Sequence, residues 1–132
     1  MSGKRLLLDT NAVSSLFKGE EAIRYLLADA EEVLLSIVVL GELYYGARKS
    51  GRVKENLEKT ASFASTCTLL ACDHDVSQVY GLVRDRLRRL GKPIPENDIW
   101  IAATTLCHEL VLVTHDRHFD HVEGLNVVRW DS

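Results

Sequence analysis

The chain has 132 residues, enough to bury one hydrophobic core and close to the usual size of a single domain. Hydrophobic residues make up 46% of it and charged residues 27%, a balance that excludes disordered and fibrous proteins. The formal net charge of −3 disfavours a nucleic-acid ligand for the molecule as a whole, because phosphate backbones attract basic surfaces.

No stretch of the sequence is apolar for long enough to span a membrane, and the first residues lead into a strand rather than a signal peptide. We therefore expect a cytoplasmic protein with no membrane partner. The three cysteines, Cys67, Cys72 and Cys107, are an odd number and lack a CxxC spacing. This pattern argues against a disulfide framework and a structural zinc site, so we expect reduced, partly buried thiols.

Apolar patterning predicts an alternation of strands and helices. Residues 5–8 have the length of a buried strand, and helical periodicity follows at 12–18 and 20–30. A second strand is expected at 33–38, although its last residues could already begin the helix that runs through 41–48. This order of elements is typical of a parallel α/β sheet.

The middle of the chain continues the alternation. Residues 52–67 and 75–90 are predicted helices, separated by a strand at 68–72. Gly91 is expected to end the longer helix. Its apolar residues at helical spacing are expected to face inward: Val76, Val79, Leu82, Val83, Leu87 and Leu90.

Both prolines fall within residues 92–97, which are predicted to be a loop. A buried helix is expected at 98–108, followed by strands at 110–114 and 126–130. The chain is therefore predicted to be a single α/β domain over residues 1–132. Its central sheet should be mainly parallel, with about four to five strands flanked by helices.

Four acidic residues each interrupt an apolar context: Asp9, Glu42, Asp98 and Asp116. Asp9 and Asp116 directly follow predicted strands, and ligands of open α/β sheets bind at the carboxyl ends of strands. If the four meet in space, they form a site for one or two Mg²⁺ or Mn²⁺ ions, which take oxygen ligands. Such ions activate water and stabilise charge at a phosphoryl centre.

Each acid also has a purely structural explanation. Asp98 could be a first-turn acid that complements its helix dipole, and Asp9 could cap the helix that follows it. Asp116 could close an Asx turn after its strand. Glu42 is the hardest to explain structurally, because a carboxylate among apolar neighbours costs free energy unless it is paired or metal-bound.

Four segments resemble, in order and spacing, the four motifs of PIN-domain ribonucleases: Asp9-Thr10-Asn11, Ser36 to Glu42, Asn97 to Ala103, and Leu112 to Phe119. More narrowly, the chain is similar to the toxin component of VapBC toxin–antitoxin modules. The resemblance covers essentially the whole chain. A strand-end Asp-Thr-Asn alone is a weak signal, whereas four acidic motifs in order within 132 residues are a strong one.

The resemblance implies a catalytic quartet that binds Mg²⁺ or Mn²⁺, made of Asp9, Glu42, Asp98 and Asp116. Asp9 and Asp98 would be the firmest metal ligands. Asn11 and Thr114 match positions that orient the acids or a metal-bound water. The family cleaves RNA phosphodiester bonds and leaves a 5′-phosphate and a 3′-hydroxyl. Its members are usually homodimers, inhibited by a small antitoxin whose C-terminal segment lies across the active-site groove.

The segment after the last predicted motif carries three histidines at intervals of three: His115, His118 and His121. The three could form a zinc site; alternatively, His115 and His118 lie near the groove, where one of them contacts phosphate or shapes a turn. Arg117 is a candidate contact for RNA phosphate. Asp120 lies four residues after Asp116, so it is the alternative acid at this corner of the site.

Basic residues occur in two groups: Arg48, Lys49, Arg52 and Lys54, then Arg84, Arg86, Arg88, Arg89 and Lys92. Each group is either a solvated helix face or a set of phosphate contacts.

The predicted function is a metal-dependent endoribonuclease. The alternative is a non-catalytic PIN-like module that binds nucleic acid or a partner through an antitoxin complex. The quartet favours the enzyme, because a pure binding module has little use for four mutually repelling carboxylates.

Overall fold

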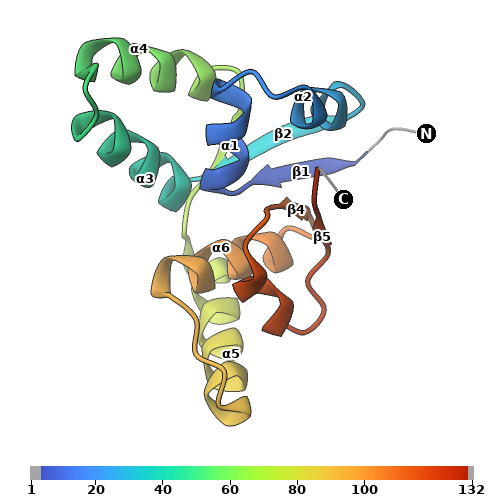
Figure 1. The fold of residues 1–132 in the computed structure, drawn as a ribbon. Coiled ribbons are helices and arrows are strands. Elements are labelled where there is room, and N and C mark those ends of the chain that lie inside the picture. The colour runs from blue at the N-terminus through green and yellow to red at the C-terminus, as the bar shows by residue number, and fades with distance from the viewer. Residues whose placement is uncertain (1–3, 131–132) are drawn as a thin grey trace.

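The computed structural model describes residues 4–130, which form a five-stranded sheet in the order β3-β2-β1-β4-β5 (Figure 1). All four strand pairings are parallel. The strands are β1 (Arg5–Leu8), β2 (Glu32–Ser36), β3 (Thr68–Leu70), β4 (Val111–Val113) and β5 (Val127–Val128). The predicted α/β class, with a mainly parallel sheet of four to five strands, is confirmed.

The central strand is β1, and its apolar sequence explains its position. Leu6, Leu7 and Leu8 are fully buried, and Leu7 pairs with Leu34 on one side and Leu112 on the other. Because all three strands run in the same direction, the residues that follow β1, β2 and β4 emerge at one edge of the sheet. Asp9 is the first residue after β1, and its amide donates to the Val113 carbonyl at the end of β4 (3.0 Å).

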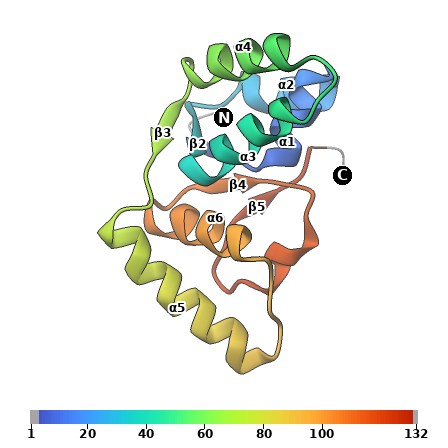
Figure 2. The same cartoon turned by 90° about the vertical axis from the view of Figure 1, so that its left-hand side faces the viewer.

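Six α-helices and one 3₁₀ helix surround the sheet within the described residues. They are α1 (Thr10–Phe17), α2 (Glu21–Ala28), α3 (Ile37–Arg48), α4 (Val53–Ala64), α5 (His74–Leu90), α6 (Glu96–Cys107) and η1 (Arg117–His121). Figure 1 shows α1 and α2 on one side of the sheet and α6 on the other, with α5 packed outside α6. The α3–α4 pair extends beyond the edge at which the strands end, and Figure 2 looks onto that edge.

Side-chain caps fix where several helices begin. Asp9 accepts from the Thr10 amide at the start of α1, and Ser36 accepts from the Val39 amide at the start of α3. Both capping residues directly follow or end a strand, so each chain reversal takes place at the same edge of the sheet. At the other end of α5, Gly91 adopts a left-handed conformation (φ 67°) that stops the helix, as predicted.

Ile37 and Val38 belong to α3, because the Ser36 cap ends β2, which confirms the alternative that the last residues of the predicted strand begin the helix. Other predicted boundaries were wrong. Glu96 and Asn97 form the first turn of α6 rather than part of a loop, because Pro95 occupies the capping position. The strands at the two edges of the sheet are also shorter than predicted: β3 ends at Leu70, and β5 comprises only Val127–Val128.

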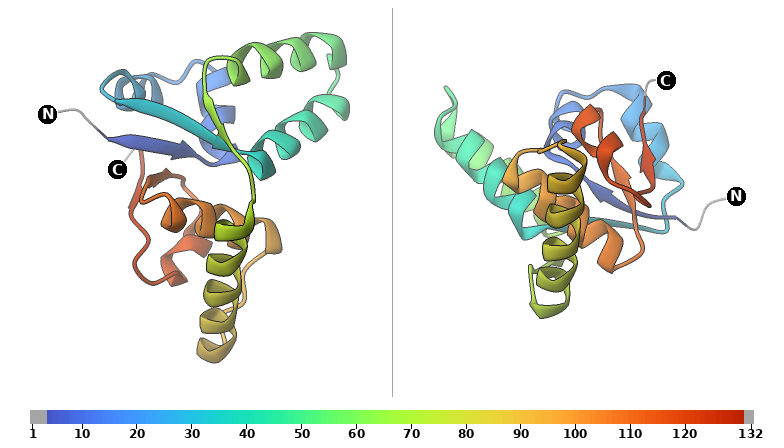
Figure 3. Two further views of the ribbon diagram at one scale, coloured as in Figure 1. Left: turned by 180° about the vertical axis from the view of Figure 1, so that it is seen from behind. Right: turned by 90° about the horizontal axis from the view of Figure 1, so that it is seen from below.

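The expected inward face of α5 was partly wrong. Val76, Val83 and Leu87 are buried, but Leu82 and Leu90 are exposed, because α5 packs mainly against α6 and projects beyond the rest of the molecule (Figures 2 and 3). The three cysteines are partly buried and free, as expected. None of the helices within residues 4–130 is long and apolar enough to cross a membrane.

Candidate active site

Asp9 lies at the centre of the polar edge of the sheet and is held from two sides. It is 5% exposed, and one carboxylate oxygen, Oδ1, accepts from the Thr10 amide at 2.8 Å. The other, Oδ2, accepts from the Thr114 hydroxyl at 2.7 Å and from the Asn11 side-chain amide at 3.4 Å. Asp9 therefore caps α1 through Oδ1, as expected, while the side chains of Thr114 and Asn11 hold its other oxygen, Oδ2.

Thr114 and Asn11 connect the ends of β1 and β4. The Thr114 hydroxyl donates to Asp9 and accepts from the Asp116 amide at 3.0 Å. The Asn11 side-chain amide donates through Nδ2 to the Thr114 hydroxyl (3.4 Å), and its Oδ1 accepts from the His115 backbone amide (3.3 Å). The two residues predicted to support the acids thus form one hydrogen-bonded network with Asp9 and with the backbone that carries Asp116.

Glu42 comes from the second turn of α3, which the Ser36 cap directs toward α1. Its carboxylate accepts from the Thr10 hydroxyl and from the side-chain amide of Asn97 (3.2 Å). Glu42 therefore contacts the first turns of both α1 and α6. This explains how a carboxylate surrounded in sequence by apolar residues is accommodated: its neighbours Val39 and Leu43 pack into the core while Glu42 points toward the sheet edge.

Asp98 and Asp116 reach the same place from α6 and from the turn after β4. Asp98 is in the first turn of α6, and its side chain is 13% exposed. Asp116 caps η1 by accepting from the His118 amide at 2.9 Å, which is the Asx-type contact considered for it. The His118 ring nitrogen Nδ1 lies 3.0 Å from a carboxylate oxygen of Asp98 and 3.0 Å from one of Asp116.

A single cleft of about 440 Å³ gathers the four acids predicted from the sequence. It is lined by Asp9, Thr10, Asn11, Ser14, Ser15, Lys18, Glu42, Asp98 and Asp116. Sequence reasoning missed Lys18 and gave no role to Asn97, whereas His118 lies beside the cleft, as expected for a residue near the groove. The interval of three between the histidines pointed to a zinc site, whereas the informative signal was the position of His118 two residues after Asp116.

Burial and repulsion from neighbouring carboxylates raise the pKa values of Asp9 and Asp98. Burial raises the pKa of Asp9 from 3.8 to about 6, and Asp98 and Glu42 add to the rise, while hydrogen bonds from Thr114 and Thr10 oppose it. Burial also raises the pKa of Asp98, against the lowering effect of the hydrogen bond with His118. The pKa of His118 is raised, chiefly by its hydrogen bond to Asp98.

This arrangement is chemically suited to a divalent cation. Four carboxylates face one cleft, and among the cleft-lining residues of the described chain only Lys18 is a permanent cation. Ligand atoms of Asp98, Asp116 and His118 already lie within 4.8 Å of one another. Carboxylate oxygens bind hard cations such as Mg²⁺ and Mn²⁺, so the donor set fits the metal expected from the sequence.

Comparison with known proteins identifies the fold family. A family model described as the PIN domain matches residues 6–125, a span that includes all four acids. The chain belongs to the PIN-domain family.

Within the PIN-domain family, the chain is similar to proteins named VapC. The chain is 33% identical over 129 residues to Ribonuclease VapC2 of Haemophilus influenzae, covering 96% of this chain and 98% of that protein. It is 32% identical over 130 residues to the tRNA(fMet)-specific endonuclease VapC of Shigella flexneri, and the match covers 96% of this chain and 98% of that protein. The structure of DNA-bound VapBC from Salmonella typhimurium superposes with a TM-score of 0.89 at 30% identity, over 96% of this chain and 98% of that one. The resemblance inferred from the motifs is confirmed.

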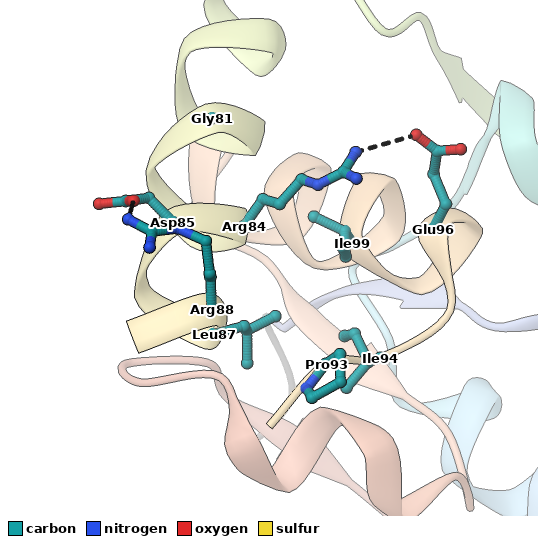
Figure 4. Close-up of a pocket in the computed structure, with 9 residues that line it drawn as sticks. All are labelled: Gly81, Arg84, Asp85, Leu87, Arg88, Pro93, Ile94, Glu96 and Ile99. Atoms are coloured by element: carbon teal, nitrogen blue, oxygen red, sulfur yellow. Dashed lines mark hydrogen bonds and ion pairs between the residues drawn. The ribbon is translucent and has the colours of Figure 1, made fainter. Parts of the chain in front are cut away.

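A larger hollow of this PIN domain, about 770 Å³, lies between α5, the 92–95 loop and α6 (Figure 4). Its charged side chains neutralise one another: Arg84 pairs with Glu96 at 3.3 Å, and Arg88 pairs with Asp85 at 2.7 Å. Arg89 also pairs with Asp85, at 2.9 Å. Three of the arginines proposed as phosphate contacts are therefore engaged in ion pairs on the helix surface, which supports the solvated-face interpretation for them.

The other two histidines of the 115–121 segment of this PIN domain do not lie with His118 at the acids. His115 stacks on the Trp130 ring with centroids 3.4 Å apart, and His121 is an exposed residue at the end of η1. The three-histidine zinc site is therefore not formed in the described chain. Arg117 directly follows the cleft residue Asp116, and its side chain is 85% exposed. It lies 3.9 Å from Asp120, which also pairs with Arg129 at 2.9 Å.

Proposed function

We propose that this chain is a metal-dependent endoribonuclease that hydrolyses RNA phosphodiester bonds and acts as the toxin of a toxin–antitoxin pair. The observation that carries the proposal is the convergence of four carboxylates on one cleft that offers few compensating cations. Membership of the PIN-domain family and similarity to proteins named as VapC ribonucleases support cleavage of RNA.

The metal site is proposed to consist of Asp9, Glu42, Asp98 and Asp116, with Mg²⁺ or Mn²⁺ as the cofactor. Such an ion supplies an activated water and stabilises the charge that develops on the phosphate. The donor chemistry of the cleft supports this assignment. In the absence of the ion, the raised pKa values of Asp9 and Asp98 reflect the cost of collecting these acids without a counter-charge.

The side chains around the acids are proposed to hold them in position. Thr114 and Asn11 fix one oxygen of Asp9. Thr10 and Asn97 fix the two oxygens of Glu42 from separate helices. Hydrogen-bonded partners of this kind restrict the rotamers of metal ligands, and their loss typically costs about 10–100-fold in metal affinity or activity.

RNA is proposed to enter along a groove between α1, α3 and α4. The groove continues from the cleft and shares with it Thr10, Ser14, Lys18 and Glu42. Lys59 and Asn56 line it farther from the acids. Lys18 and Lys59 are suited to contact RNA phosphates along this groove, and exposed Arg117 is a third candidate contact.

The proposed partner is a VapB-like antitoxin, and the proposed assembly is a homodimer that the antitoxin joins. The similarity to VapBC, solved bound to DNA, supports a cognate partner for this chain. The cytoplasm is the proposed location.

The direct test is cleavage of structured RNA, starting with tRNA(fMet), by the purified full chain with Mg²⁺, Mn²⁺ or EDTA. Wild type should cleave only with metal. Asp98→Asn should lose about three orders of magnitude or more, because a metal ligand supports several kcal/mol of charge stabilisation. Comparing Asp116→Asn with Asp120→Asn identifies the acid at the variable corner, since Asp120 pairs with Arg129 and does not line the cleft.

Three outcomes would count against the proposal. Cleavage that survives both EDTA and Asp98→Asn would mean that these acids are not the catalytic site. Tight binding of RNA or antitoxin with no cleavage at any metal concentration would favour the non-catalytic module. Loss of activity in Asp120→Asn but not in Asp116→Asn would exchange these two residues in the quartet.

A further inference from the structure

One histidine lies beside the cleft, in contact with two of its acids, in a position that the acidic quartet does not explain. His118 Nδ1 lies 3.0 Å from Asp98 Oδ2 and 3.0 Å from Asp116 Oδ1. The two carboxylates come from different elements, α6 and the turn after β4. A nitrogen 3.0 Å from one oxygen of each carboxylate is placed as a third donor beside these two oxygens.

The backbone holds this histidine beside the site. The His118 amide donates to Asp116 Oδ1 at 2.9 Å, so the residue is tied to the carboxylate that its ring also contacts. The next residue, Phe119, is 1% exposed and anchors η1 in the core. The ring itself is 50% exposed. It therefore has room to rotate by a small amount while its attachment point stays fixed.

We propose that His118 is a metal ligand through Nδ1, and that it makes the site prefer Mn²⁺ to Mg²⁺. The inference rests on the proposed metal-dependent function and adds a nitrogen donor to its four carboxylates. The ligand atoms of Asp98, Asp116 and His118 lie within 4.8 Å of one another, close enough for one ion to contact all three after small rotations.

The preference follows from the chemistry of the donors. Mg²⁺ is small, demands near-ideal octahedral oxygen coordination and gives up its water reluctantly. Imidazole is a borderline donor that suits first-row transition metals, whose affinity for a nitrogen-containing site rises along the series from Mn²⁺. Replacing one oxygen donor by a nitrogen therefore weakens the site for Mg²⁺ relative to Mn²⁺.

The alternative role for His118 is that of a counter-charge, which leaves when the ion binds. The two roles predict opposite effects of removing the ring. Loss of a ligand weakens Mn²⁺ binding, whereas loss of a competing group leaves Mn²⁺ binding unchanged or strengthens it. This difference in sign makes the proposal testable by binding measurements, without reference to catalysis.

The experiment measures Mn²⁺ binding to the full chain by calorimetry and by pulsed EPR. Wild type should show nitrogen hyperfine coupling to bound Mn²⁺. His118→Gln should lose that coupling and bind Mn²⁺ about tenfold or more weakly, with a much smaller change for Mg²⁺. His118→Asp should bind both ions but with a reduced ratio of Mn²⁺ to Mg²⁺ affinity. The matched control is His121→Gln, an exposed histidine of the same 3₁₀ helix, which should behave as wild type.

The outcomes separate this proposal from the proposed function. Mn²⁺ binding without nitrogen coupling, or unchanged affinity in His118→Gln, overturns the ligand role, while metal-dependent cleavage lost in Asp98→Asn still supports the nuclease. Absence of Mn²⁺ binding to a folded wild type overturns both proposals. Melting curves for each variant ensure that loss of binding is not loss of the fold.

Discussion

The two hollows beside α6 differ in how their charges are balanced. The larger one, next to α5, contains arginines and acids that neutralise one another as ion pairs. The smaller cleft collects four carboxylates, and only one permanent cation lines it in the described chain. Uncompensated charge is costly to maintain, so its presence indicates a ligand that supplies the missing charge. In this molecule the charge balance, and not the size of the hollow, distinguishes the proposed metal site from the hollow next to α5.

The largest expected effect comes from removing the most buried of these charges. The pKa of Asp9 is about 6 in the folded chain, against an ordinary value of 3.8 for an aspartate in the unfolded chain. Between these pH values the native state therefore binds more protons than the unfolded state. The contribution of Asp9 to stability is therefore most favourable below pH 3.8 and is lost as the pH rises through 6. The loss amounts to about 3 kcal/mol, since each pKa unit corresponds to about 1.4 kcal/mol.

Asp9→Asn should remove this loss in metal-free protein. We expect the variant to be up to about 3 kcal/mol more stable than wild type near neutral pH in EDTA, with the difference vanishing in acid. Added Mg²⁺ or Mn²⁺ should stabilise wild type and not the variant. Urea unfolding at both pH values measures these differences. Equal pH dependence in the two proteins would show that Asp9 is not strained by its surroundings.

The second effect concerns the network that holds Asp9. Thr114→Val keeps the shape but removes the hydroxyl that donates to Asp9 and accepts from the Asp116 amide. We expect a loss of about 1–3 kcal/mol in stability and about 10–100-fold in metal affinity or cleavage rate. Thr105→Val is the matched control, because that buried hydroxyl donates only to the Ile101 carbonyl within α6. A loss of metal affinity of the same size in Thr105→Val would refute the specific role of Thr114.

The sequence was sufficient to predict the class of the fold and the acids that meet in the cleft. Strand-end carboxylates and buried apolar runs are local patterns, and parallel pairing brings strand ends together at one edge. It was less informative at the ends of elements. Whether Ile37 belongs to a strand or a helix depends on the Ser36 side chain reaching the Val39 amide, which apolar patterning does not reveal.

Two contacts between the acids and residues on other elements were also not predicted from the sequence. Asn97 contacts Glu42 across 55 residues of chain, and His118 contacts Asp98 across 20. Such contacts depend on the packing of α6 against α3 and η1 rather than on spacing along one element. Similarly, Leu82 has the apolar character and helical position of a core residue but is exposed, because nothing in the described chain covers that face of α5.

A smaller effect is expected at the rim of the cleft. Arg117→Gln removes an exposed cation that carries only a long ion pair to Asp120, so folding should be nearly unchanged. If Arg117 contacts an RNA phosphate, the variant should bind RNA more weakly, and the slope of log affinity against log salt should fall by about 0.7 for a single strand. Filter binding at several salt concentrations, with catalytically silent Asp98→Asn as the background, measures the slope. An unchanged slope would exclude this contact.

The smallest effect is expected in the larger hollow, where Asp85 is paired with two arginines. The Arg88 guanidinium lowers the pKa of Asp85, with Arg89 adding to it. A lowered folded pKa means that the pairing stabilises the protein above the unfolded pKa of Asp85 and that this contribution is lost in acid. Asp85 is well solvated, so Asp85→Asn should lower the melting temperature only slightly near neutral pH, and not in acid. RNA cleavage and metal affinity should match wild type, because this acid already has its counter-charge within the chain. If Asp85→Asn impaired cleavage as strongly as loss of a cleft acid, charge balance would not distinguish the two hollows.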